Sequence, residues 1–153
     1  EELADIDVAK REFHIRNRVL HAPTFGTEDG KAHFVVTPVT EQEPGRLMLA
    51  SMRSEGQFNS IIYEETDSYR GQAGRESIFL SAEDMEARGL VEGQAVMVRS
   101  DAGEMRGIAT RFDLPPGSVL AYYPEANVLV GQAVDPRSKT PAFKSVPVEV
   151  SAA

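Results

Sequence analysis

Glycine and proline interrupt the chain at short intervals, and between these breaks lie short runs rich in aliphatic and β-branched residues. Short runs bounded by turn residues are typical of β-strands. The runs are residues 47–51, 78–80, 95–98, 106–111, 118–122 and 146–150. Six or more short strands with one or two brief helices predict a β-barrel or a compact α+β domain, and they disfavour a series of βαβ units.

Several connections between these runs carry local signals. Ser81 with Asp84 three residues later predicts a helix N-cap, and Gly89 predicts the left-handed residue that ends this short helix. The sequence Asp-Ala-Gly-Glu at residues 101–104 predicts a hairpin turn. Pro147 lies inside the last run and predicts an edge strand, because proline cannot donate a hydrogen bond to a neighbouring strand.

The chain divides by composition near residue 45. Residues 1–45 contain one β-prone run at residues 34–37 and end in a polar stretch closed by Pro44-Gly45, which predicts a linker. We therefore expect residues 1–45 to be the tail of a preceding domain, and residues 46–150 to form one domain. The chain opens on Glu-Glu-Leu, so we expect it to be part of a longer protein.

Composition disfavours several classes of site and partner. The absence of cysteine removes disulfides, thiolate zinc sites and iron–sulfur ligation, and His14, His21 and His33 lack metal-ligand spacing. A net charge of −8 disfavours nucleic acid and anionic membranes as partners. Because no apolar run approaches the roughly 18 residues of a membrane span, we expect a cytoplasmic location.

Standard catalytic constellations are not visible, and the acidic run at residues 64–67 is interpreted as a solvated face. Two long loops, residues 52–74 and 124–143, are the functional candidates. In the first, Arg53 follows a strand and is flanked by serines, which suits either an anion site or a surface ion pair. In the second, Asn127 either presents its amide to a heterocycle or caps a turn.

Arg70 and Arg75 form a second candidate anion site. Two glycines separate them, and an anion bound there would need the positive charge that they supply. The alternative is that both arginines pair with the nearby carboxylates of Glu64, Glu65 and Asp67. The residues alone leave both alternatives open.

Five motifs occur in a characteristic order. They are Leu-x-Ser-x-Arg-(x)3-Gln-x-Asn-Ser at 49–60, Arg-Gly-(x)2-Gly-Arg at 70–75, Leu-(x)2-Gly-(x)2-Val-x-Val at 90–98, Tyr-Pro-Glu-Ala-Asn-Val-Leu at 123–129 and Thr-Pro-Ala-Phe-Lys at 140–144. In this order they resemble the C-terminal dinucleotide-binding domain of molybdopterin oxidoreductases. The resemblance covers residues 46–150, and the formate dehydrogenase-like branch is nearest.

The resemblance implies a fold and a ligand. The fold is a mainly β (α+β), six-stranded double-psi β-barrel, and the ligand is a bis(molybdopterin guanine dinucleotide) carrying molybdenum or tungsten. Because an upstream domain ligates the metal in this family, no catalytic or metal-ligating residue is expected here. The residues that match cofactor-binding positions of the family are Ser51, Arg53, Gln57, Asn59, Ser60, Asn127, Phe143 and Lys144.

The resemblance also implies a parent enzyme, a molybdopterin oxidoreductase of the formate dehydrogenase alpha-subunit type. Its upstream domains and an electron-transfer subunit are the expected partners. The isolated chain is expected to bind no cofactor and to be inactive. The alternative is a free-standing double-psi β-barrel that binds a protein partner or a small ligand and has no redox role, since one fold serves many functions.

Overall fold

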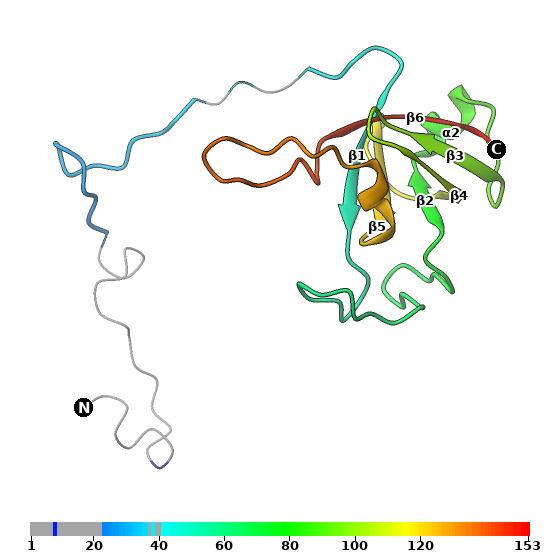
Figure 1. Cartoon of the computed structure of the whole chain (residues 1–153), viewed down its shortest axis with the longest axis horizontal. Helices are drawn as coiled ribbons and strands as arrows, with labels where there is room; N and C mark the ends of the chain where they lie inside the picture. The colour runs from blue at the N-terminus through cyan, green and yellow to red at the C-terminus, as the bar shows by residue number, and fades with distance from the viewer. Residues whose placement is uncertain (1–7, 9–22, 37, 39–40) are drawn as a thin grey trace. The chain divides into compact units, whose positions relative to one another are not determined.

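The structure is a computed structural model that describes residues 8, 23–36, 38 and 41–153 (Figure 1). The chain divides into two units, Glu1–Val39 and Thr40–Ala153. In the first unit, residues 34–36 are exposed and form no strand, although the run at residues 34–37 is β-prone. A β-prone run becomes a strand only where a neighbour supplies hydrogen bonds and a buried face. Thr37, His14 and His21 lie outside the described residues.

The second unit is a closed barrel of six strands with two short helices. The elements are β1 (Leu47–Met52), β2 (Ser77–Leu80), α2 (Ala82–Ala87), β3 (Ala95–Arg99), β4 (Glu104–Arg111), β5 (Ser118–Tyr122), the 3-10 helix η1 (Glu125–Leu129) and β6 (Val146–Ala152). The strands follow one another around the barrel in the order β1-β5-β2-β4-β3-β6. The predicted strands and brief helices of this unit are confirmed.

The pairing pattern repeats under a two-fold relation. The segment β1-β2-α2-β3 has the same order of elements as β4-β5-η1-β6. The parallel pair β1 with β5 corresponds to β4 with β2, and the antiparallel pair β1 with β6 corresponds to β4 with β3. Two interlocked halves of this kind make a double-psi β-barrel, which confirms the predicted fold.

Local sequence signals determine the ends of α2. The Ser81 hydroxyl accepts a hydrogen bond from the Asp84 N–H at 3.0 Å, and Gly89 has a φ of +62°. The Leu90 N–H donates to the Met85 carbonyl at 2.9 Å, and both side chains are buried. This is a Schellman motif with its hydrophobic contact. The predicted caps are confirmed, and residues 101–104 lie at the hairpin turn between β3 and β4.

Pro147 does not lie on an edge strand, so that prediction is wrong. β6 pairs with β1 on one side and with β3 on the other, and the barrel has no free edge. The two neighbours use different parts of β6: Pro147 lies opposite Met48 of β1, whereas pairing with β3 begins only at Glu149. The missing N–H is tolerated because Pro147 has a strand neighbour on one side only.

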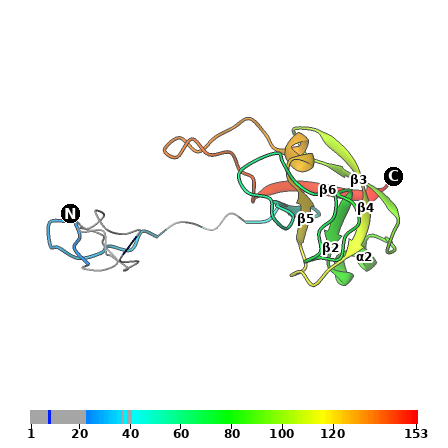
Figure 2. The ribbon, with the colours of Figure 1, turned by 90° about the horizontal axis from the view of Figure 1, so that it is seen from below.

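The loop between β1 and β2, residues 53–76, is attached to the barrel through Asp67. This carboxylate is 1% exposed and accepts hydrogen bonds from the Tyr122 hydroxyl at 2.9 Å and from Arg70 Nη1 at 2.5 Å. Figure 2 shows this loop, in green, passing beside the ends of β2 and β5. Because the bonds of Asp67 reach the last residue of β5, they hold the β1–β2 loop against the end of the barrel.

The barrel is expected to fold without residues 1–45, because all strand pairing lies downstream of Pro44-Gly45. A chain that begins at Arg46 loses Gln42, whose Nε2 donates to the carbonyls of Arg46 and Gly117 at 2.7 and 3.1 Å. Two such bonds contribute about 1–3 kcal/mol. Urea unfolding should therefore stay cooperative, with a lower midpoint than that of a chain beginning at Glu41. Loss of cooperativity would show that the boundary is misplaced.

Asp67→Asn should destabilise the barrel in a pH-dependent way. Burial raises the pKa of Asp67, but hydrogen bonds from Arg70 and Tyr122 and the charge of Arg70 outweigh it and hold the pKa below the ordinary 3.8. A lowered pKa in the folded state means that the carboxylate stabilises the fold above about pH 3.8 and loses this contribution as the pH falls through its folded value.

At pH 7 the free energy of unfolding of the wild-type chain should be about 1.5–3 kcal/mol higher than that of Asp67→Asn. This is the usual range for hydrogen bonds to a charged group. That difference should shrink below about pH 3.8. Urea unfolding at a series of pH values measures it. Asp113→Asn, at an exposed position, is the matched control. A pH-independent difference would contradict the assignment.

Candidate functional site

A cavity of about 240 Å³ lies where β1 ends. Three separate segments form it: the end of β1 with the start of the β1–β2 loop, the residue that follows β5, and the approach to β6. Backbone hydrogen bonds join them, from Ser51 N–H to the Phe143 carbonyl at 2.9 Å and from Tyr123 N–H to the Met52 carbonyl at 2.7 Å. The lining residues are Ser51, Met52, Arg53, Asn59, Tyr123, Phe143 and Lys144.

Arg53 and Lys144 give this cavity, here named the Arg53–Lys144 cavity, a positive wall. Arg53 follows β1, and its Nη2 donates to the side-chain carbonyl of Asn59. Lys144 Nζ donates to the Ser51 carbonyl. Partial burial lowers the pKa of Lys144, and the neighbouring charge of Arg53 lowers it further. Two cations that disfavour each other in this way would both be stabilised by an anion between them.

Five of the eight other arginines in residues 41–153 contrast with this pair, whereas Arg106, Arg111 and Arg137 also form no ion pair with a described residue. Within residues 41–153, Arg46, Arg70, Arg75, Arg88 and Arg99 each have a carboxylate within 4.0 Å. Neither Arg53 nor Lys144 forms an ion pair with another described residue. In a chain with a net charge of −8, two adjacent cations without a carboxylate are suited to an anion supplied from outside.

Ser51 and Phe143 belong to the frame of the cavity. The Ser51 hydroxyl is 4% exposed and donates to the Phe143 carbonyl at 3.2 Å, so the end of β1 and the approach to β6 are bonded twice. Five of the eight sequence-predicted residues therefore line one cavity: Ser51, Arg53, Asn59, Phe143 and Lys144. They come from both long loops and from the strand end that the sequence singled out.

Gln57 and Ser60 lie behind the cavity wall, among the residues of the β1–β2 loop. Gln57 is 6% exposed, its Oε1 accepts from Ser54, and its Nε2 donates to the carbonyls of Ser60 and Tyr123 at 3.1 and 3.0 Å. The Ser60 hydroxyl bonds within the same loop, to Ile62. Because the amide of Gln57 is fully engaged, it connects the loop to the end of β5 and does not line the cavity.

Asn127 lies apart from these residues. It is exposed within η1, where its N–H donates to the Pro124 carbonyl at 2.9 Å and its carbonyl accepts from Val130 at 3.0 Å. Its side chain has no hydrogen-bond partner among the described residues, and it does not line the Arg53–Lys144 cavity. The amide is therefore available to a ligand or partner that covers η1.

The two alternatives for Arg70 and Arg75 are resolved differently. Arg70 pairs with Asp67, as the ion-pair alternative states. Arg75 pairs with Glu125, a carboxylate that neither alternative included. The guanidinium of Arg75 is 5% exposed, so it is not an open anion site. Met52 and Tyr123, which also line the cavity, stand inside the recognised motifs but were not singled out.

A metal centre is not visible in the described residues. No group of three or more His, Asp or Glu side chains there is arranged to hold a metal ion. No helix within the same residues is long and apolar enough to cross a membrane. What the cavity offers is a guanidinium, an ammonium and an amide, a donor set suited to phosphate oxygens.

Comparisons with known proteins identify the family of this chain. Residues 47–147 match the family described as "Molydopterin dinucleotide binding domain". The chain is 35% identical over 143 residues to the uncharacterized oxidoreductase Rv2900c of Mycobacterium tuberculosis, covering 84% of this chain and 18% of that protein. It is 29% identical over 153 residues to protein YdeP of Escherichia coli, covering 90% and 20%. The chain thus spans about a fifth of the length of these curated relatives.

Among solved structures, acetylene hydratase from Pelobacter acetylenicus shares the fold, with a TM-score of 0.56 at 14% sequence identity. The superposition covers 70% of this chain and 18% of that one. The family match spans more than half of the chain and includes five of the six strands in full. The chain therefore belongs to the molybdopterin dinucleotide-binding domain family.

Proposed function

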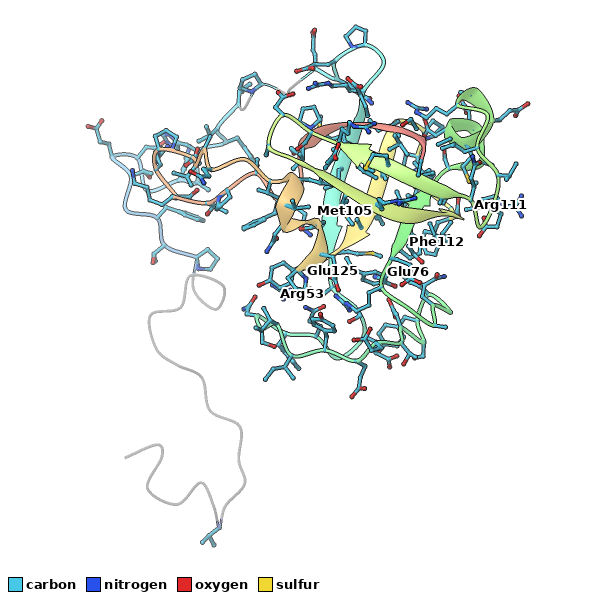
Figure 3. All side chains as sticks on the ribbon, turned by 45° about the vertical axis from the view of Figure 1, so that its right-hand side comes forward. Arg53, Glu76, Met105, Arg111, Phe112 and Glu125 are labelled. Atoms are coloured by element: carbon cyan, nitrogen blue, oxygen red, sulfur yellow. The ribbon has the colours of Figure 1, made fainter. Side chains whose placement is uncertain are left out.

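We propose that this chain is the cofactor-binding domain of a larger molybdopterin-dependent oxidoreductase, and that the Arg53–Lys144 cavity receives a phosphate group of the dinucleotide. The observation that carries the proposal is the pair of adjacent cations without carboxylate partners, at the junction of three segments. Figure 3 shows Arg53 at the end of the barrel that carries the β1–β2 loop. Membership of the family and the names of the oxidoreductase relatives support the same function.

The residues present fit the charged part of such a cofactor. A pyrophosphate presents several acceptor oxygens and about two negative charges. Arg53 can donate two parallel hydrogen bonds, and Lys144 adds a second charge. The cavity volume of about 240 Å³ is below the roughly 300–1,000 Å³ usual for a whole small-molecule site, so it suits one group of the dinucleotide. When bound, the cofactor supplies the redox chemistry, and this chain supplies charge and orientation.

The finer assignment is also a proposal. The sequence resemblance to molybdopterin oxidoreductases implies glycine and histidine at the positions of Met52 and Gln57 in many of those enzymes, and these two departures favour the formate dehydrogenase-like branch. We propose a bis(molybdopterin guanine dinucleotide) of molybdenum or tungsten as the cofactor, and a cytoplasmic enzyme. Its upstream domains would complete the cofactor site, and an electron-transfer subunit would remove electrons.

In the parent enzyme, Arg53→Ala should lower cofactor retention about 10- to 150-fold, since a hydrogen bond from a charged group contributes about 1.5–3 kcal/mol. Arg53→Lys should recover only part of this loss, because an ammonium keeps the charge but loses the two-pronged geometry. Molybdenum or tungsten and guanine nucleotide per polypeptide, measured after gel filtration, report retention.

Arg99→Ala is the matched control, because Arg99 is a half-exposed arginine that pairs with Glu104 at 3.0 Å on β3 and β4. It should leave the cofactor content unchanged. Full cofactor content in Arg53→Ala would exclude Arg53 from the site. Full recovery in Arg53→Lys would instead show that a positive charge alone is sufficient at position 53. Arg53 would then act as an exposed ion-pair partner does, and such pairs contribute only about 0–1 kcal/mol.

Asn127→Ala in the same enzyme should reduce cofactor content less than Arg53→Ala. Its exposed amide can make neutral hydrogen bonds to the pterin, each contributing about 1 kcal/mol, or about fivefold in affinity. Asn127→Asp keeps the size of the side chain but removes its hydrogen-bond donor, because a carboxylate cannot donate. It therefore separates the loss of a hydrogen bond from the loss of side-chain volume in Asn127→Ala. Cofactor content equal to wild type in both variants would remove Asn127 from the site while leaving the role of Arg53 intact.

A further inference from the structure

Arg75 is a buried side chain that forms hydrogen bonds with several segments at this end of the barrel. It precedes β2, and its Nε and Nη2 donate to the two carboxylate oxygens of Glu125 at 2.6 and 3.0 Å. Its Nη1 donates to the Ser54 hydroxyl at 2.8 Å, and its Nη2 donates to the Tyr123 carbonyl at 2.5 Å. One guanidinium therefore connects the β1–β2 loop, the end of β5 and η1.

Two aromatic rings complete the surroundings of this guanidinium. Its central carbon lies 3.6 Å from the ring centroid of Tyr63 and 4.8 Å from that of Tyr122. The contact with Tyr63 adds a later part of the β1–β2 loop to the connected segments. A planar cation can stack on a ring and donate hydrogen bonds in its own plane at once, which an ammonium cannot do.

The segments that Arg75 connects are the ones that carry part of the cavity wall. Ser54 directly follows Arg53, and Gln57, whose Oε1 lies 3.4 Å from Arg75 Nη2, precedes Asn59 by two residues. Tyr123 lines the cavity itself. Arg75 is not a lining residue, so it acts on the cavity only through the position of these neighbours.

Stability alone is a poor explanation for this arrangement. Burying an ion pair costs desolvation that its attraction often fails to offset, and apolar residues of the same volume would frequently be as stable. A buried network with every partner satisfied does, however, impose one geometry on its members. No buried polar side-chain atom of the described residues lacks a hydrogen-bond partner, so this network meets that condition.

We propose that Arg75 is a positioning residue, which fixes residues 53–60 against Tyr123 and so holds Arg53 and Asn59 at the spacing that an anion requires. The inference rests on the proposed function, because the anion is the phosphate assigned to the Arg53–Lys144 cavity. Glu125, labelled in Figure 3, is the partner of Arg75 in this role, since it neutralises the buried guanidinium and connects it to η1.

The test uses the 153-residue chain, with two measurements on each variant. Backbone amide hydrogen exchange at residues 53–60 reports the order of the loop, with the strands β2 and β4 as internal reference. Titration with inorganic pyrophosphate reports the affinity of the Arg53–Lys144 cavity for an anion. The variants are Arg75→Met, Arg75→Lys and Arg53→Ala, and Arg88→Met is the matched control, because Arg88 also forms a partly buried ion pair, with Asp84 on α2.

Arg75→Met should accelerate exchange at residues 53–60 at least tenfold and weaken pyrophosphate binding at least tenfold, with exchange in β2 and β4 within twofold of wild type. Arg75→Lys should give intermediate values for both. Arg53→Ala should weaken binding without accelerating loop exchange, which separates contact with the anion from positioning. Arg88→Met should change neither quantity.

Loop exchange and binding within twofold of wild type in Arg75→Met would overturn the positioning role. If hydrogen exchange in Arg75→Met is faster throughout the barrel, the Arg75→Lys variant decides whether Arg75 positions the loop. Wild-type loop exchange and wild-type pyrophosphate binding in Arg75→Lys would also overturn the positioning role. Failure of the wild-type chain to bind pyrophosphate would instead count against the part of the proposed function that assigns a phosphate group to the Arg53–Lys144 cavity. The exchange measurement would then still decide whether Arg75 orders the loop.

Discussion

Parallel pairing of β1 with β5 and of β2 with β4 is the constraint on which the rest of this structure depends. Parallel neighbours cannot be joined by a tight hairpin, and among consecutive strands only β3 and β4 are neighbours, so the other connections pass over an end of the barrel to a strand that is not adjacent. The β1–β2 loop is one of these crossings, and residues 130–145 make another long connection. Both reach the end where β1 and β5 finish, and together they form the Arg53–Lys144 cavity.

Two kinds of positive charge follow from this arrangement. The arginines that hold the loops in place, Arg70 and Arg75, are matched with carboxylates inside the fold, so they add little to the field outside. Arg53 and Lys144 sit on the frame that these pairs maintain and have no carboxylate of their own among the described residues. The internal ion pairs of Arg70 and Arg75 thus hold the loops in place, and Arg53 and Lys144 are the two cations at the cavity that remain for recognition.

The sequence predicted those features that depend on neighbouring residues. The caps of α2 need only Ser81, Asp84 and Gly89, and short apolar runs between turns indicated the six strands, although residues 34–36 show that such a run also needs a pairing neighbour. Features set by distant residues were missed. The partner of Arg75 lies 50 positions away, and the interior position of Gln57 depends on a carbonyl 66 positions away. Pro147 was misassigned because only the closed barrel shows that β1 and β3 pair with different parts of β6.

The two-fold relation gives the barrel two ends of similar backbone geometry, and the chain has elaborated only one. At the opposite end, where β2 and β4 finish, a hollow is lined by residues that include Ser81, Arg111, Glu83 and Asp113. Its connections are short, residues 112–117 and 88–94, and its carboxylates disfavour an anion. Under the two-fold relation, the β4–β5 connection at this end corresponds to the β1–β2 loop, and the β2–β3 connection corresponds to the β5–β6 connection. Longer loops grafted there would create a second recognition surface without altering the first.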